Sequence, residues 1–182
     1  MTTTRPTPRN YATPSIVLHW LTVLLIIAVY ALIEFRGIFP KGTPERDMMK
    51  AWHMTLGMTV FALTWLRLLF NAVNKRPPIT PTPPQWQRTL TQIAHGLLLA
   101  FLVFLPFSGW LMVSAFGKPV PFWGLELPAL IDPMREVGKN IEELHEAIAK
   151  AGYALIGLHA VAALWHHHVM KDDTLKRMLG RN

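Results

Sequence analysis

Four stretches of mostly apolar residues alternate with shorter polar segments along this chain. They cover roughly residues 15–35, 51–70, 90–115 and 143–168. A helix needs about 20 predominantly apolar residues to cross a bilayer, and each stretch reaches that length. The pattern therefore predicts an all-α integral membrane protein, a four-transmembrane-helix bundle in which residues 1–182 form a single membrane domain.

The connecting segments differ in character. The second connection, "NKRPPITPTPPQW", is rich in proline, which cannot continue a helix and favours an extended, solvated connector. The third, "FGKPVPFWGLELPALIDPMREVGKN", is long for a helix bundle, and its composition predicts a loop packed over one membrane face. The polar N-terminal segment shows no small-residue cleavage site, so the first apolar stretch is expected to be a retained helix.

The distribution of charged residues predicts how the bundle is oriented in the membrane. The chain carries 18 Lys and Arg residues against 11 acids. The side that holds both termini has ten of these cations, but only Asp172 and Asp173 as acids. Because cytoplasmic loops are enriched in Lys and Arg, both termini are predicted to be cytoplasmic, with "KDDTLKRM" as a solvated basic tail. No long Lys/Arg-rich tract is present, which argues against a nucleic-acid partner.

Histidines supply the candidate chemistry, because the chain has no cysteine. His19 lies near the cytoplasmic end of the first stretch and His53 near the outer end of the second. In the fourth stretch His145 and His159 are separated by 14 residues, about 21 Å along a helix, and share one helical face. Helix direction then pairs His53 with His145 near the outer surface and His19 with His159 near the inner one.

Ionisable side chains inside a span are costly and therefore mark candidate sites. Two histidines from different helices at one depth can hold a flat metal macrocycle from both sides, and two such pairs predict two haems stacked across the membrane. The alternative is that each histidine only hydrogen-bonds a neighbouring helix. Zinc is disfavoured, because a two-histidine site with no carboxylate or cysteine beside it is a poor zinc site.

At these residues the chain resembles the bacterial cytochrome b561 family, closest to its superoxide-oxidising type. The resemblance rests on "VLHW" at His19, "EFRGIFPKG", the H-x-x-x-G of His53, "RPPITPTPPQW", a P-x-x-G in the third stretch and "LHEAIAKAGYALIGLHA". It implies two b-type haems in a bacterial inner membrane, one on His19 and His159 at the cytoplasmic side and one on His53 and His145 at the periplasmic side.

The resemblance also implies an activity. Members of this type oxidise superoxide to dioxygen at the periplasmic face and pass the electrons through the two bis-histidine haems to ubiquinone, so the expected enzyme is a superoxide:ubiquinone oxidoreductase. The expected partners are membrane lipid, superoxide and ubiquinone, with no obligatory protein partner. The alternative is a membrane cytochrome b that carries electrons for, or anchors, a separate dehydrogenase or hydrogenase.

Three further residues are candidates for the two ends of this path. Lys118 directly follows the third stretch and is the predicted contact for the superoxide anion, with an ordinary solvated lysine as the alternative. His166 lies two turns beyond His159, at headgroup depth, where an imidazole can bind a haem propionate or deliver a proton to reduced quinone. His95 is the second candidate for that role; simple interfacial anchoring is the alternative for both.

Overall fold

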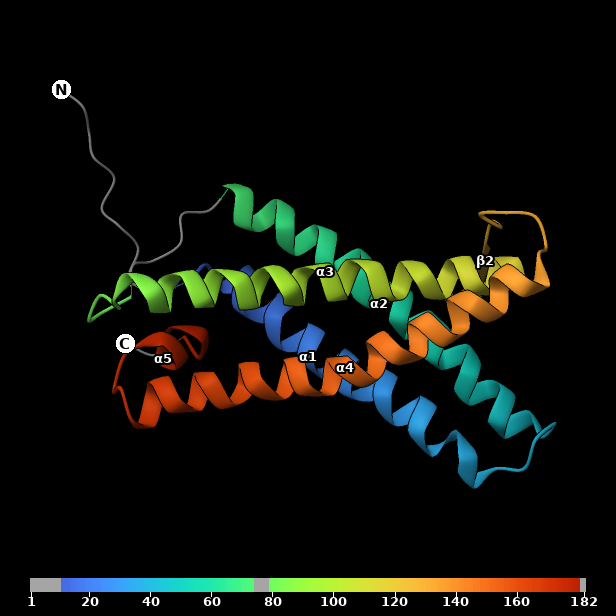
Figure 1. Ribbon diagram of the computed structural model, residues 1–182, viewed down its shortest axis with the longest axis horizontal. Coiled ribbons are helices and arrows are strands. Elements are labelled where there is room, and N and C mark those ends of the chain that lie inside the picture. Colours follow the sequence, from blue (N-terminus) through green and yellow to red (C-terminus); the bar gives the residue numbers. More distant parts are fainter. Residues whose placement is uncertain (1–10, 74–78, 181–182) are drawn as a thin grey trace.

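The computed structural model describes residues 11–73 and 79–180. Four long helices follow one another, α1 (Thr13–Phe35), α2 (Pro44–Val73), α3 (Gln85–Ala115) and α4 (Arg135–His168) (Figure 1). Each is long and apolar enough to cross a membrane, so the predicted four-helix membrane architecture is confirmed. Five cations counted in the charge bias lie outside the described residues, namely Arg5, Arg9, Lys75, Arg76 and Arg181.

Three helices extend beyond the apolar stretches that predicted them. α2 begins at Pro44, α3 at Gln85 and α4 at Arg135, each well before the first apolar residue of its span. The added turns are rich in Glu, Lys, Arg and Gln, which are good helix formers, and proline is tolerated in a first turn. α4 has 34 residues, about 51 Å at 1.5 Å per residue, so it is longer than the hydrocarbon core is thick.

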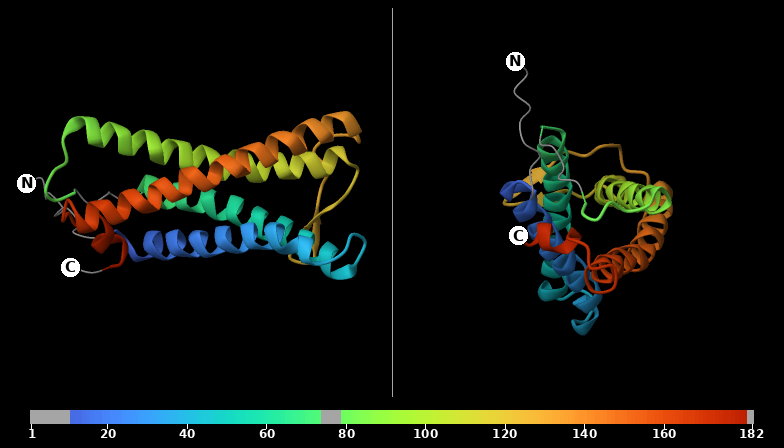
Figure 2. Two further views of the ribbon diagram at one scale, coloured as in Figure 1. Left: turned by 60° about the horizontal axis from the view of Figure 1, so that its bottom comes forward. Right: turned by 90° about the vertical axis from the view of Figure 1, so that its left-hand side faces the viewer.

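The helices form two antiparallel pairs that cross. α1 packs along α2 and α3 along α4, and α2 also contacts α3, as the views in Figure 2 show. α1 and α4 meet through side chains: the Tyr30 hydroxyl donates to the Ala149 carbonyl at 2.7 Å, and the Tyr153 hydroxyl donates to Glu34 at 2.7 Å. The bundle therefore closes around a centre that all four helices approach.

Gly152 marks the tightest point of this packing. A Cβ atom built there would lie 2.5 Å from Phe101 Cζ on α3 and 2.5 Å from the Tyr30 hydroxyl on α1. Since real Cβ contacts are not that short, the close approach of three helices requires glycine at this position. It lies on α4 between His145 and His159, and so between the two predicted haem sites.

Most large apolar side chains face outward. In the most apolar window of each helix only 6–17% of the residues are buried, the opposite of a water-soluble bundle and the arrangement expected where lipid is the solvent.

Threonines inside the bundle donate hydrogen bonds to their own helix: Thr22 donates to the Leu18 carbonyl at 2.6 Å and Thr64 to the Val60 carbonyl at 2.8 Å. Buried hydroxyls are thereby satisfied without breaking the apolar surface.

The connection from α3 to α4 contains a hairpin that the sequence did not predict. Strands β1 (Val120–Phe122) and β2 (Leu125–Leu127) pair antiparallel around Trp123 and Gly124, whose φ values are 50° and 84°, as in a two-residue hairpin turn. The hairpin is held on α2 by Thr55, which donates to the Pro121 carbonyl at 3.0 Å. The expected loop over one membrane face is thus a β-hairpin anchored to a helix.

The C-terminal segment also differs from expectation. It folds into α5 (Thr174–Met178) at the end of the bundle opposite the hairpin (Figure 1). Arg177 is only 2% exposed and pairs with Asp173 at 3.2 Å, and the Trp20 indole donates to the Met178 carbonyl at 2.9 Å. The prediction of a solvated tail is wrong, because these polar contacts hold the segment against α1 and α4.

Candidate functional site

The structure brings the four predicted ligand histidines together in two pairs. His53 of α2 and His145 of α4 have ring centres 6.5 Å apart at the hairpin end. His19 of α1 and His159 of α4 have ring centres 6.5 Å apart at the α5 end. The same histidines that helix direction pairs by depth therefore lie next to each other in the structure.

The spacing within each pair suits one metal ion between two rings. With a metal–imidazole bond of about 2.0 Å on each side and about 1.1 Å from nitrogen to ring centre, the two centres would lie about 6.2 Å apart. Among the described residues, no group of three or more His, Cys, Asp or Glu side chains could hold a metal ion. Each pair therefore fits a metal whose remaining ligands come from a bound group, as in a haem.

Hydrogen bonds orient both rings of the outer pair. His53 Nδ1 lies 3.0 Å from the Val29 carbonyl, which only accepts, so this nitrogen carries the proton. Ser108 donates its hydroxyl to the Leu105 carbonyl at 2.7 Å and therefore accepts from His145 Nδ1 at 3.0 Å. Both imidazoles thus keep a lone pair on Nε2, the form in which histidine binds a metal.

A cavity with mainly apolar walls lies beside the outer pair. Its lining includes both histidines, Gly57, Pro106 and Gly109, and it is otherwise formed mostly by Val, Leu and Met side chains. A Cβ atom at Gly57 would meet nothing within 4 Å, whereas one at Gly109 would come within 3.2 Å of His145 Cε1. The glycines keep space open on α2 and beside the imidazole, as a flat cofactor between helices requires.

The inner pair has more polar surroundings. Arg67 Nη2 lies 3.2 Å from His19 Nδ1, and since a guanidinium only donates, His19 Nδ1 accepts here. The His95 ring of α3 lies 5.5 Å from the His159 ring. Three imidazoles and a guanidinium therefore meet at one depth. A neutral ring that accepts at Nδ1 carries its proton on Nε2, so His19 can bind a metal through Nε2 only when Arg67 turns to another acceptor, such as a haem propionate.

The outer candidate, Lys118, lies in the chain between Val113 and Val120, two residues that line the outer cavity, but is not itself part of the lining. Its side chain is exposed, and its backbone N–H donates to the Val113 carbonyl at 3.1 Å. Arg36 follows the outer end of α1, the helix whose Val29 carbonyl contacts His53.

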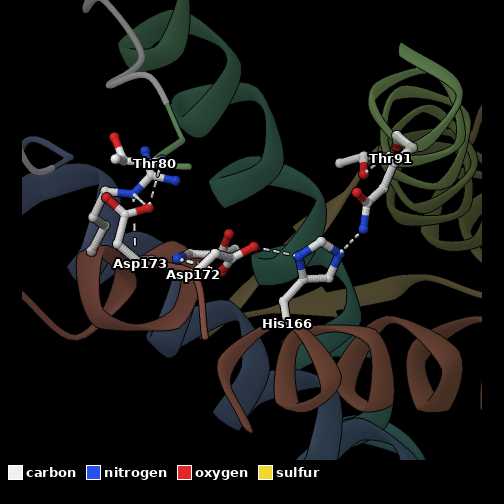
Figure 3. A network of polar contacts seen from close by, with 8 residues as sticks. Thr80, Thr91, His166, Asp172 and Asp173 are labelled. Carbon is white, nitrogen blue, oxygen red and sulfur yellow. Dashed lines mark hydrogen bonds and ion pairs between the residues drawn. The ribbon is translucent and has the colours of Figure 1, made fainter. Parts of the chain in front are cut away.

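The inner candidates lie at different depths. His95 is beside His159, whereas His166 meets the first turn of α3, where its Nε2 lies 3.2 Å from Gln87 Nε2. His166 Nδ1 lies 2.5 Å from Asp172 Oδ2 (Figure 3). Burial acts to raise the pKa of the Asp172 carboxyl, but hydrogen bonds from His166 and Thr174 outweigh it and hold that pKa below its usual value.

The sequence did not identify three residues that contact the histidines, namely Arg67, Gln87 and Asp172. Gln87 belongs to a turn of α3 that precedes the apolar stretch, and Asp172 belongs to the tail expected to be solvated. The contact of Gln87 with His166 could have been found from helix register. If α3 and α4 are antiparallel and His95 lies beside His159, then residues near 87, earlier in α3, lie beside His166, later in α4.

A membrane-spanning four-helix bundle that carries two facing histidine pairs is the architecture of a membrane cytochrome b. Comparison with known proteins agrees with this class: the family model described as prokaryotic cytochrome b561 matches residues 10–181. The chain belongs to the prokaryotic cytochrome b561 family. Membership implies a multi-pass bacterial membrane protein that transfers electrons with b-type haem, and it confirms the family resemblance found in the sequence motifs.

Curated relatives match the chain nearly end to end. "Cytochrome b561 homolog 1" of Escherichia coli (strain K12) is 36% identical over 172 residues, covering 94% of this chain and 98% of the relative. "Probable superoxide oxidase CybB" of Yersinia pestis is 32% identical over 171 residues, covering 94% and 96%. "Cytochrome b561 homolog 2" of Escherichia coli (strain K12) is 28% identical over 184 residues, covering 97% and 94%. The similarity is therefore to whole proteins rather than to one segment.

Proposed function

We propose that this protein is a di-haem superoxide:ubiquinone oxidoreductase of the bacterial inner membrane, a single membrane domain. It oxidises superoxide to dioxygen at the periplasmic face and passes the electrons through two bis-histidine haems to ubiquinone. The observation that carries the proposal is the pair of histidine sites at the two ends of α4, each with ring centres 6.5 Å apart. The relative named a probable superoxide oxidase supports the choice of substrate.

The ligand roles follow from the pairs. His53 and His145 would hold the periplasmic-side iron, and His19 and His159 would hold the cytoplasmic-side iron. A haem held by two imidazoles would supply one-electron transfer when bound. Val29 and Ser108 keep the outer rings turned so that Nε2 is available.

At the outer end, the chain has only to attract and orient a small anion. Each superoxide gives up one electron and leaves as dioxygen, so no covalent bond to the protein is made. Lys118, just after α3, and Arg36, just after α1, supply positive charge at the outer end, and a focused positive patch raises the encounter rate of an anion. Local charge is needed because the outer side carries eight cations and nine acids.

At the inner end, the chain has to supply protons. One ubiquinone takes two electrons, from two superoxide ions, and two protons to become ubiquinol. His166 is the proposed proton donor at the membrane surface. His95, which lies beside the inner histidine pair, is placed to bind a propionate or the quinone.

The direct test uses the detergent-purified protein and follows its absorption spectrum during a pulse of superoxide, with and without ubiquinone. Two b-type haems should become reduced promptly and should be reoxidised only when quinone is present. Haems that superoxide does not reduce would contradict the proposal and favour the alternative of an electron carrier or anchor for a dehydrogenase or hydrogenase partner. Protein that purifies without haem would contradict both.

Lys118 offers a sharper test of the outer end. In Lys118→Gln the rate of haem reduction by superoxide should fall roughly three- to tenfold at low ionic strength, because a local positive charge is lost. The difference should shrink as salt screens the charge. Lys139→Gln is the matched control, since Lys139 is an outer-side lysine already paired with Glu136 at 3.2 Å. Equal rates for Lys118→Gln and wild type at low salt would exclude Lys118 as the contact.

A further inference from the structure

The side chain of His166 is held between two partners from different parts of the chain. Asp172, in the turn after α4, approaches one ring nitrogen, and Gln87, in the first turn of α3, approaches the other. Figure 3 shows the ring between the turn and α3. Asp172 is only 5% exposed, so the contact is shielded from water.

The contacts fix the orientation of both groups. Asp172 accepts from the Thr174 backbone N–H through Oδ1 at 3.0 Å, and its own N–H donates to the His166 carbonyl at 3.1 Å. The carboxylate is thus locked in place by its own turn, with Oδ2 directed at His166 Nδ1. Because Gln87 presents its amide NH₂ group, His166 Nε2 accepts there and the ring proton lies on Nδ1.

This arrangement provides hydrogen-bond partners for both the neutral and the protonated imidazole of His166. When His166 gains a proton, the proton goes to Nε2, because Nδ1 already donates to Asp172. A half-turn of the Gln87 amide then presents its carbonyl oxygen as the acceptor. Asp172 stays ionised in both states and stabilises the imidazolium. The proton that can come and go is therefore the one on Nε2, which faces α3.

We propose that Asp172 is a positioning residue which, with Gln87, makes His166 a one-proton carrier for the reduction of quinone. This inference rests on the proposed function. In each transfer the Nε2–H bond breaks and an O–H bond forms on the reduced quinone, whose electrons come from superoxide. His166 then regains its proton from the cytoplasm, and two transfers complete one quinol.

Two other charged residues of the C-terminal segment, Asp173 and Arg177, are engaged with each other. Asp173 pairs with Arg177 of α5 at 3.2 Å and accepts from the Thr80 backbone N–H at 3.1 Å. Arg177 is directed over the ring of Tyr11, 5.8 Å from its centre. On α4 itself the neighbours are His167 and His168, whose rings meet edge to face with their centres 4.8 Å apart. Asp172 is thus the carboxylate that bears directly on the His166 ring.

The test measures quinone-dependent reoxidation of the reduced protein as a function of pH. In Asp172→Asn the imidazolium loses its counter-charge, so the alkaline limb of the profile should move down by about one pH unit, an approximately tenfold slower rate on that limb. Gln87→Glu should move the limb upward instead, because a carboxylate beside Nε2 favours the protonated ring. Asp173→Asn is the matched control and should keep the wild-type profile.

Two further readouts separate this inference from the proposed function. Reduction of the protein by superoxide without quinone needs no proton from this end, and its failure in the wild type would contradict the proposed function itself. NMR titration of the His166 imidazole, assigned by its loss in His166→Gln, should show the same opposite shifts without any quinone. An unshifted Asp172→Asn titration, or an equal shift in Asp173→Asn, would overturn the inference, as would Gln87→Glu moving downward.

Discussion

What each histidine can do depends on the partner of its Nδ1 atom. At the outer pair the partners are a carbonyl and a hydroxyl, neutral acceptors that favour a neutral ring with a free Nε2. At His166 the partner is a carboxylate, which favours a ring that can take up a second proton. At His19 it is a guanidinium, which cannot accept, so this ring can bind a metal through Nε2 only when Arg67 turns to another acceptor. The neighbours of each histidine thus decide whether its imidazole is suited to metal binding or to proton transfer.

The histidine pairs predict the effect of removing one ligand. In His145→Ala the outer site loses an axial ligand while His19 and His159 are untouched, so the haem bound per protein should fall to about half. A pyridine haemochrome assay against protein mass measures this ratio. His167→Ala, on the same helix beyond both sites, is the control and should keep full haem. A His145→Ala protein with unchanged haem would show that His145 is not a ligand.

The ligand candidates could be predicted from the sequence, but their partners could not. The 14-residue spacing of His145 and His159 and the direction of the helices are enough to pair four histidines by depth. Asp172 and Gln87 meet His166 only because the tail folds back and α3 begins before its apolar part. Those contacts are made by polar segments, and the spacing of apolar residues gives no information about how polar segments fold.

At the scale of elements, α4 carries one histidine of each pair, and at its middle Gly152 allows α1 and α3 to approach it closely. The apolar stretches predicted the helices but not their ends, because the helices continue as polar turns into water. The hairpin was missed because each strand has only three residues, too few for an alternating pattern. Its turn places a tryptophan at positive φ, a choice that local propensity does not favour.

Gly152 therefore predicts a packing defect on substitution. Gly152→Ala puts a methyl group into contact with Phe101 and Tyr30, and such overpacking costs about 1–3 kcal/mol. For a chain of this size the midpoint of thermal unfolding in detergent should fall by roughly 2–10 °C. Gly157→Ala, five residues further along α4, meets nothing within 4 Å and is the matched control. Equal midpoints for the two variants would contradict the close approach of α1, α3 and α4.

At the scale of the whole molecule, the two ends of the bundle are built differently. The hairpin end has an apolar cavity, and Lys118 lies in the segment that leads from α3 into the hairpin. The α5 end gathers His95, Arg67 and the contact of His166 with Asp172. An apolar pocket open to a small anion suits an electron entry side, whereas a polar end with a proton-exchanging imidazole suits the reduction of quinone. The proposed direction of transfer therefore requires the α5 end to face the cytoplasm.

Orientation can be tested on the full chain with reporters. Among the described residues the α5 side holds five cations and two acids. A fluorescent protein fused after Asn182 should therefore fold in the cytoplasm and fluoresce, while alkaline phosphatase at that position should be inactive. Alkaline phosphatase inserted after Asp132, in the connection between α3 and α4, should be active, because this segment faces the periplasm. The reverse result would place Lys118 in the cytoplasm and separate His166 from cytoplasmic protons. The same bundle would then have to carry electrons inward from a cytoplasmic donor, contrary to the proposed reaction.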